Sequence, residues 1–292
     1  MAFHFHRIGD RKDGRRIRSI APLNQFIPYI MKFRNESTNY YEESFKIDEV
    51  DALLHELRLE GYKGIGLMHF TIASYVRALA KLPGLNRYIA GRRIFARHKI
   101  EVAMMVKREM SLQGDETAIK VEFEPTDTLL DVYRKMDAEI SNIKTNKESN
   151  GAELLTAFFC SLPRLVLQFA ITLLKLADYF DLIPRSVLKA SPFHASLMIT
   201  NLGSLGISPV FHHLYNFGTL PAFVSFGVKR RICEMNAKGE VESNQYIDYK
   251  FSLDERIADG IYFASFLREF KKPFHSPRAL LVPPERIEQD VR

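Results

Sequence analysis

The amino-acid sequence predicts an α/β (α+β) fold, because helical and strand patterns both recur along one chain of 292 residues. Residues 100–106 are almost continuously apolar, which is typical of a strand buried at the centre of a sheet. Residues 118–123 alternate apolar with charged side chains, which is the period of a half-buried strand. Residues 49–59 and 67–81 repeat apolar side chains at helical spacing instead. We therefore expect one core built from both kinds of element.

The first hundred residues begin with an irregular basic stretch, followed at 22–31 by an apolar segment that prolines interrupt. A strand is predicted to begin at 45–48, and a short one at 94–95. The helix over 49–59 has one apolar face, formed by Val50, Leu53, Leu54 and Leu57. The helix over 67–81 has a similar side, formed by Ile72, Val76, Leu79 and Ala80.

Two further helices are expected later in the chain. Residues 126–128 are of N-capping types, and they precede a predicted helix from residue 129 to about 144. A polar break follows at 145–151. The other helix is predicted over residues 261–270.

Residues 152–183 form a strongly apolar segment whose polar residues fall on one narrow helical stripe, namely Arg164, Gln168, Thr172, Lys175 and Asp178. Pro163 and these charges argue against a membrane span, which needs about 20 continuous apolar residues. Three environments stay open for the helix at about 164–180: an interface within the protomer or oligomer, a wall for an apolar acyl substrate, or a membrane surface or hydrophobic protein partner. Burial inside an assembly is the favoured interpretation.

The composition is that of a globular protein, with 46% hydrophobic and 26% charged residues. No linker rich in Pro, Gly or Ser divides the chain, so residues 1–292 are predicted to form a single domain with a helical insertion at about 151–190. Cys160 and Cys233 lack metal-ligand spacing, and the N-terminus lacks the apolar region of a signal peptide. We therefore expect a cytoplasmic protein with no metal site.

The net charge is +6, and basic residues cluster at 11–18, at 92–93 with 97–99, and at 229–231. Such clusters could attract the phosphates of coenzyme A, nucleic acid or anionic lipid. A solvated basic surface is the favoured alternative, because charge runs carry little specificity. No nucleic-acid motif is present, so no nucleic-acid partner is expected.

The most informative motif lies near the C-terminus, where residues 251–260 read F-S-L-D-E-R-I-A-D-G. The segment resembles the D-H-R-x-x-D-G signature of the catalytic domain of dihydrolipoyl acyltransferases of 2-oxoacid dehydrogenase complexes. It also resembles the shorter H-x-x-x-D-G signature of chloramphenicol acetyltransferase. Asp254, Arg256, Asp259 and Gly260 match this frame, and Glu255 stands at the position of the general-base histidine.

Other segments extend the resemblance over most of the chain. Residues 197–206 resemble the family's F-T-I-S-N-L-G strand, with Thr200 at the position of the serine that hydrogen-bonds the oxyanion, followed by Asn201 and Gly203. A threonine keeps a hydroxyl donor for that role. Residues 220–228 resemble the strand that leads into a variable hairpin, and residues 277–286 resemble the C-terminal tail. Residues 47–54 and 69–86 agree more loosely.

The resemblance implies a chloramphenicol acetyltransferase-like fold, in which helices flank a mixed β-sheet and the protomers form a homotrimer or a larger trimer-based assembly. It implies active sites between protomers, with the oxyanion hydroxyl and the base on different subunits. It also implies coenzyme A or acyl-coenzyme A as a possible substrate, with no tightly bound cofactor. Full-length acyltransferases also contain a lipoyl domain and a peripheral-subunit-binding domain, and neither is expected in this chain.

The resemblance further implies that Asp259 forms a structural salt bridge, with Arg256 or an arginine of the 15–18 run as its partner. Gly260 is expected to allow a tight turn from strand to helix.

At Glu255 the chain keeps the position of the family's catalytic residue but not its residue type. A histidine can accept and return a proton near neutral pH, whereas a glutamate with a pKa near 4.3 is a poor base for an alcohol unless burial raises that pKa. Three interpretations stay open: an inactive relic, a carboxylate base with a raised pKa, or a site that another base serves. His212 and His213 could supply the missing imidazole, although adjacent loop histidines more often lie on the surface or in packing. A metal role for the pair is not expected, because neighbouring side chains of a strand point to opposite faces.

Two functions therefore compete. The first is a noncatalytic or chemically altered homologue that serves as a structural or partner-binding component of an acyltransferase-like assembly. The second is a free-standing coenzyme A-dependent acyltransferase that uses Thr200 for the oxyanion and Glu255, His212 or His213 as a nonstandard base. The absent histidine supports the first, and the retained motif frame supports the second.

Overall fold

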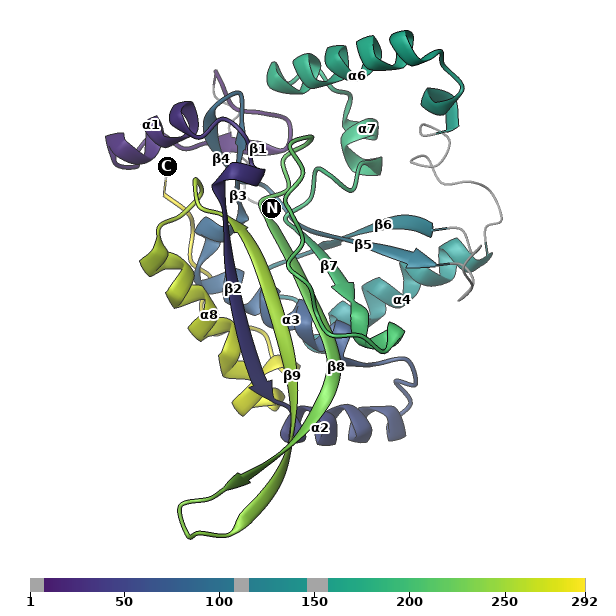
Figure 1. Ribbon diagram of the computed structural model, residues 1–292, viewed down its shortest axis with the longest axis vertical. Coiled ribbons are helices and arrows are strands. Elements are labelled where there is room, and N and C mark those ends of the chain that lie inside the picture. The colour runs from purple at the N-terminus through teal and green to yellow at the C-terminus, as the bar shows by residue number, and fades with distance from the viewer. Residues whose placement is uncertain (1–7, 108–115, 146–156, 292) are drawn as a thin grey trace.

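The computed structural model describes residues 8–107, 116–145 and 157–291, which form two β-sheets and a layer of helices. The larger sheet has six strands in the order β2-β9-β8-β7-β5-β6 (Figure 1). Its strands are β2 (Thr38–Lys46), β5 (Ile100–Lys107), β6 (Glu116–Phe123), β7 (Leu197–Asn201), β8 (Ala222–Met235) and β9 (Val241–Asp254). The sheet is mixed, because β7 runs parallel to β5 and β8 while the other pairs are antiparallel.

A three-stranded antiparallel sheet of order β1-β4-β3 lies at one end of the molecule. Its strands are β1 (Gly14–Arg16), β3 (Arg87–Ala90) and β4 (Arg93–Arg97). The helices are α1 (Pro22–Ile30), α2 (Asp48–Leu59), α3 (Leu67–Lys81), α4 (Leu129–Thr145), α6 (Arg164–Tyr179), α7 (Arg185–Ala190) and α8 (Gly260–His275).

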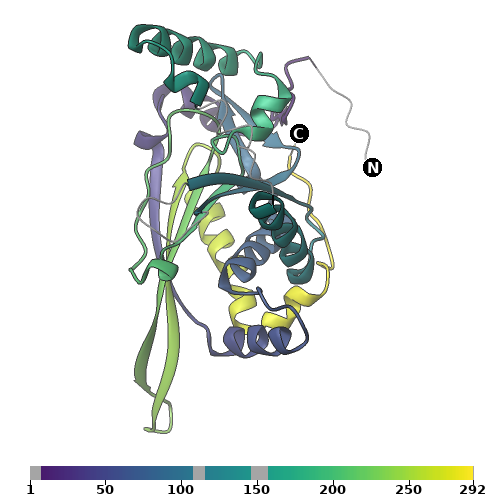
Figure 2. The same cartoon turned by 90° about the vertical axis from the view of Figure 1, so that its right-hand side faces the viewer.

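Helices α2, α3, α4 and α8 cover one face of the six-stranded sheet (Figure 2). The core between them is rich in aromatic side chains, because α8 repeats phenylalanines at helical spacing: Phe263, Phe266, Phe270 and Phe274. The ring of Phe45 stacks on that of Phe274, with centroids 4.5 Å apart. The helical layer therefore holds β2 and β9 in place, and these strands lead to the motif at residues 251–260.

The opposite, outer face of the sheet carries a smaller apolar cluster beneath the chain segment 207–221. Its buried members are Ala103, Ala195, Met198, Leu214, Leu220 and Phe223. The paired ends of β8 and β9 continue beyond the body of the molecule as a long hairpin (Figure 1).

Most predicted elements are confirmed, including the helices over 49–59, 67–81 and 129–144 and the strands over 100–106 and 118–123. Helix α4 begins with a capping box, in which Thr128 Oγ1 accepts from the backbone N–H of Asp131 and the Asp131 carboxylate accepts from that of Thr128. Helix α8 begins one residue before the prediction and ends five residues later. Residues 146–156, which contain most of the predicted polar break, lie outside the described residues.

One prediction near the N-terminus is wrong, and one segment without a predicted element forms a helix. The strand expected from residue 45 is the end of β2, which begins at Thr38, and Asp48 already belongs to α2. Most of β2 is polar because it is an edge strand with only one face in the core, so its pattern is weak. Residues 22–30 form helix α1 despite two prolines, because Pro22 stands at its start, where a missing N–H costs nothing.

The predicted apolar helix is present as α6, but the protomer does not bury it. Leu165 is 78% exposed and Phe169 is 69% exposed. Among the described residues the helix buries Asp178, whose Oδ1 accepts a hydrogen bond from Arg11 Nη2 at 2.7 Å. His194 Nε2 lies 3.4 Å from Asp178 Oδ2. The helix is thus attached through its C-terminal end, and no helix of the described residues is long and apolar enough to span a membrane.

Candidate functional site

The predicted motif lies at the junction of β9 and α8, and a buried ion pair organises it. Arg256 Nε donates to Asp254 Oδ1 at 2.8 Å, and Arg256 Nη2 donates to Oδ2 at 2.7 Å. Both side chains are almost completely shielded, with exposed fractions of 0% for Asp254 and 2% for Arg256. Planar guanidinium and carboxylate groups favour this two-point geometry, so the pair fixes the shape of the turn.

A second guanidinium joins this pair from a distant part of the chain. Arg34 Nε lies 3.4 Å from Asp254 Oδ2, and Arg34 Nη1 donates to the carbonyl of Tyr215 at 2.6 Å. Burial lowers the pKa of Arg34 to about 10, although the negative charge of Asp254 opposes that shift. Arg256 also donates to the carbonyl of Met31 at 3.1 Å. The cluster therefore joins the motif to residues 31–34 and to the segment at 215.

Glu255 lies beside this cluster and is half-buried. Its backbone N–H donates to the carbonyl of Ser37 at 2.9 Å, and its Oε2 accepts from Asn39 Nδ2 at 3.0 Å. Burial raises the pKa of Tyr41, and the charge of Glu255 adds to that shift. No ion pair of Glu255 is found among the described residues. The carboxylate is therefore held by an amide donor of the edge strand β2.

Asp259 does not form the expected salt bridge with Arg256 or with an arginine of the 15–18 run. Its carboxylate instead caps α8, where Oδ1 accepts from the backbone N–H of Tyr262 at 2.8 Å. The structural ion pair belongs to Asp254, because only its side chain faces Arg256. Gly260 is the first residue of α8, and its φ is not in the left-handed region, so the turn does not require a glycine there.

The strand with the predicted oxyanion residue is β7. Thr200 is half-buried on it, and Asn201 follows and accepts a hydrogen bond from the backbone N–H of Ser204 at 3.2 Å. Gly203 packs directly on β8, where an added Cβ would clash with the carbonyl oxygen of Gly227. Gly203 thus has a packing role within the protomer, whereas the oxyanion role of Thr200 stays a prediction.

Thr200 and Glu255 do not meet within one protomer. Thr200 is in register with Ser225 of β8, and Ser225 is in register with Lys250 of β9. Glu255 follows Lys250 five positions further along the chain. Two strand spacings across the sheet and five residues along it place the two residues roughly 20 Å apart. A reaction that needs both would require them to come from different subunits.

His212 and His213 lie on the outer face of the sheet rather than on a strand. The ring of His212 stacks on Phe223 with centroids 4.1 Å apart and an interplanar angle of 6°. The His213 ring stacks on His212 at 4.6 Å and contacts Tyr215 at 5.1 Å. The pair is therefore packed together, and not directed to opposite faces as a strand would direct it.

Sequence reasoning missed Arg34 and Asn39, which contact Asp254 and Glu255. Arg34 lies between Lys32 and Glu36 in a short polar stretch, and nothing near it in sequence suggests a buried partner. Asn39 could have been predicted only if β2 had been recognised from residue 38. Its residues could then be aligned with those of the paired strand β9. Both depend on pairing between residues about 215 positions apart.

No protein-family model matches the chain, and no curated protein matches its sequence. Solved structures do match. A probable dihydrolipoamide acetyltransferase from Listeria monocytogenes is 13% identical with a TM-score of 0.58, and the match covers 90% of this chain and 95% of that one. The chain has the fold of dihydrolipoamide acetyltransferase cores.

Two further structures share this fold. The dihydrolipoamide acetyltransferase of Azotobacter vinelandii is 13% identical with a TM-score of 0.58, and the match covers 95% of this chain and 94% of that one. A chloramphenicol acetyltransferase is 10% identical with a TM-score of 0.52, and the match covers 86% of this chain and 92% of that one. The resemblance drawn from residues 197–206 and 251–260 is thereby confirmed at the level of the fold.

Proposed function

We propose that this chain is a noncatalytic homologue of the 2-oxoacid dehydrogenase acyltransferases and serves as a structural or partner-binding component of an acyltransferase-like assembly. The observation that carries this proposal is the environment of Glu255. The side chain at the general-base position is a carboxylate that already accepts a hydrogen bond from Asn39. An ionised carboxylate only accepts hydrogen bonds, and it lacks the near-neutral proton exchange of an imidazole.

The Azotobacter vinelandii enzyme supports this interpretation, because a serine, a histidine and an asparagine have a role in its catalytic mechanism. Its histidine and asparagine stand four positions apart, the spacing of Glu255 and Asp259 here. Glu255 is not a histidine, whereas Asp259 matches the aspartate of the D-H-R-x-x-D-G frame. The buried pair of Asp254 and Arg256 persists nonetheless, as expected if the frame serves folding and assembly.

We further propose that the protein assembles as a homotrimer or a larger trimer-based particle. Related structures include the cubic core of a pyruvate dehydrogenase complex, with 13% identity and a TM-score of 0.57. The separation of Thr200 from Glu255, roughly 20 Å by strand geometry, supports a site shared between protomers. Sedimentation velocity should give a particle of at least three times 33.7 kDa. A monomer at micromolar concentration would contradict this part of the proposal.

The decisive experiment measures thiol release from acetyl-coenzyme A and longer acyl-coenzyme A substrates, with dihydrolipoamide and simple alcohols as acceptors. The natural protein should be inert, because Glu255 cannot act as the imidazole does. Glu255→His should gain turnover if the rest of the site is retained, and Glu255→Gln is the matched variant that should stay inert. Turnover by the natural protein would overturn the proposal.

One observation favours the alternative of a coenzyme A-dependent acyltransferase with a relocated base. Tyr215 contacts the rings of His212 and His213, and its carbonyl accepts from Arg34, which faces Asp254. The histidine pair is thus connected to the motif through one packed chain of contacts. Turnover that His212→Ala or His213→Ala abolishes, while Glu255→Gln leaves it unchanged, would establish this alternative.

A further inference from the structure

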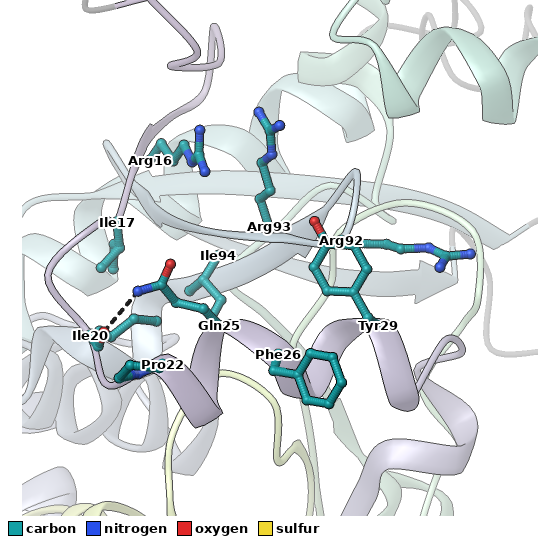
Figure 3. A pocket seen from close by; sticks show the side chains of 10 residues that line it. All are labelled: Arg16, Ile17, Ile20, Pro22, Gln25, Phe26, Tyr29, Arg92, Arg93 and Ile94. Carbon is teal, nitrogen blue, oxygen red and sulfur yellow. Dashed lines mark hydrogen bonds between the residues drawn. The ribbon is translucent and has the colours of Figure 1, made fainter.

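Two basic clusters that are far apart in sequence meet around one cavity. The cavity has a volume of about 310 Å³ and lies between α1 and the β1-β4 edge of the small sheet (Figure 3). Arg16 comes from β1, and Arg92 and Arg93 come from the turn and the first position of β4. A volume of this size lies at the lower end of small-molecule sites, which span roughly 300–1,000 Å³.

The lining combines positive charge with an apolar wall. Ile17, Ile20, Pro22, Phe26 and Ile94 form the apolar part, and Gln25 and Tyr29 complete the lining. Figure 3 shows the side chains of Arg16 and Arg93 extending toward the same side of the cavity. The Arg92 guanidinium lies 5.9 Å from the centre of the Tyr29 ring. Such a site favours a ligand with an anionic group beside an apolar or aromatic one.

No carboxylate lines this cavity, although Asp10 outside the lining attracts Arg16. The lining contains no Asp or Glu, and no ion pair of Arg16, Arg92 or Arg93 is found among the described residues. Partial burial lowers the pKa of Arg16, and repulsion from Arg93 and Arg18 adds to that shift, whereas Tyr29 and Asp10 oppose it. Positive charges that repel one another are stabilised when an anion binds between them.

A neighbouring cavity of about 500 Å³ provides a contrast. Its lining also contains arginines, but four acidic residues accompany them: Asp10, Glu124, Glu288 and Asp290. Arg16 lines both cavities. The smaller cavity differs in that its lining contains arginines and no carboxylate.

The backbone at the smaller cavity is also unusual. Gly91 and Arg92 form the two-residue turn between β3 and β4, and both have positive φ, 52° and 58° respectively. Glycine adopts this conformation readily, but an arginine there costs on the order of 1–2 kcal/mol. The turn holds Arg92 next to Tyr29 despite that cost. Strain of this kind often occurs where a side chain contacts a ligand.

We propose that this cavity binds a phosphate ester attached to an apolar or aromatic group, with Arg16 and Arg93 contacting the phosphate and the isoleucine wall contacting the apolar part. The ligand could be a soluble phosphorylated molecule or the headgroup region of an anionic phospholipid, because both present the same chemistry to the arginines. Ligand binding at this cavity does not depend on acyl transfer, and its measurement involves no acyl donor.

The test uses two probes and two charge-matched double variants. Phenyl phosphate binding is measured by calorimetry, and sedimentation measures binding to phosphatidylcholine vesicles with and without phosphatidylglycerol. Arg16→Gln with Arg93→Gln removes two cations from the cavity. Arg231→Gln with Lys271→Gln removes two exposed cations from the β8-β9 hairpin and from α8, remote from it. Circular dichroism verifies that each variant is folded, and Arg16→Lys alone provides a milder change.

Phenyl phosphate should bind to the natural protein, and the cavity variant should lose about tenfold or more in affinity, because each charge-assisted hydrogen bond contributes about that factor. The remote variant should retain its affinity within about twofold, and Arg16→Lys should be intermediate. Binding only to vesicles with phosphatidylglycerol, with the same dependence on the variants, would identify lipid as the source of the phosphate. Absence of binding to both probes, or equal losses in both double variants, would overturn the proposal.

Discussion

Asp254 and Arg256 form a two-point ion pair, with nitrogen–oxygen distances of 2.8 and 2.7 Å, inside the turn between β9 and α8. The motif position between them, Glu255, is held from outside by Asn39 at 3.0 Å. The frame of the motif is thus built from buried charges, while its central residue interacts with the edge strand. This arrangement separates the residues that determine stability from the residue that determines chemistry.

The ion pair predicts a large stability difference within one motif. Asp254→Asn should lower the free energy of unfolding by about 3–5 kcal/mol, because it leaves the guanidiniums of Arg34 and Arg256 buried without a counter-charge. Asp259→Ala should cost only about 1 kcal/mol, because it removes a helix cap. Urea denaturation of both variants measures the difference. A larger loss in Asp259→Ala would show that the salt bridge belongs to Asp259 after all.

The stability of the protein should depend on pH through His69. Burial lowers the pKa of His69 to about 4, and His69 Nδ1 accepts a hydrogen bond from the backbone N–H of Gly66 at 3.1 Å. The unfolded chain, with an ordinary histidine pKa near 6.5, therefore binds the proton first. The contribution of His69 is complete above pH 6.5 and declines as the pH falls from 6.5 toward 4, by about 2 kcal/mol between pH 7 and 5.

Urea denaturation at pH 7 and pH 5 measures this dependence, with His69→Gln as the variant that does not titrate. The glutamine keeps an acceptor for the Gly66 N–H, so its effect at pH 7 should be modest. The decline between the two pH values should be smaller in His69→Gln than in the natural protein. An equal decline in both proteins would assign the pH dependence to other groups.

Close packing of the turn after β7 on β8 predicts opposite effects on stability when two glycines of the motif frame are replaced by alanine. Gly203→Ala should cost about 1–3 kcal/mol, because the new Cβ would displace the backbone at Gly227. Gly260→Ala should be neutral or stabilising by up to about 1 kcal/mol, because no atom lies within 4 Å of the added Cβ and the residue is already helical. Thermal denaturation compares the two, and a similar loss in both would contradict the packing difference.

The attachment of α6 through Asp178 predicts a local loss of order. The carboxylate is buried, but the proximity of His194 and the hydrogen bond from Arg11 hold its pKa below the usual range. Arg11→Met should therefore loosen the helix and increase hydrogen exchange of α6 amides by about tenfold or more, since a hydrogen bond to a charged group is lost. Arg164→Met, at the exposed start of α6, is the control that should leave exchange unchanged. Equal exchange in both variants would show that other contacts hold the helix.

The sequence by itself determined the mixed α/β class, five of the main helices, the central strands and the resemblance of residues 197–206 and 251–260 to acyltransferase segments. These depend on local periodicity and on short motifs, which a single chain segment carries. The identity of Glu255 at the base position was also readable without a structure.

Only the tertiary structure decided which charges pair. It assigned the ion pair of Arg256 to Asp254 rather than Asp259, brought Arg34 and Asn39 to the motif, and joined Arg16 with Arg93 around one cavity. It also showed that the apolar side chains of α6 are exposed in the single chain. The physical reason is that an ion pair or a cavity depends on strand register and on burial between distant segments, and neither leaves a periodic signal along the chain.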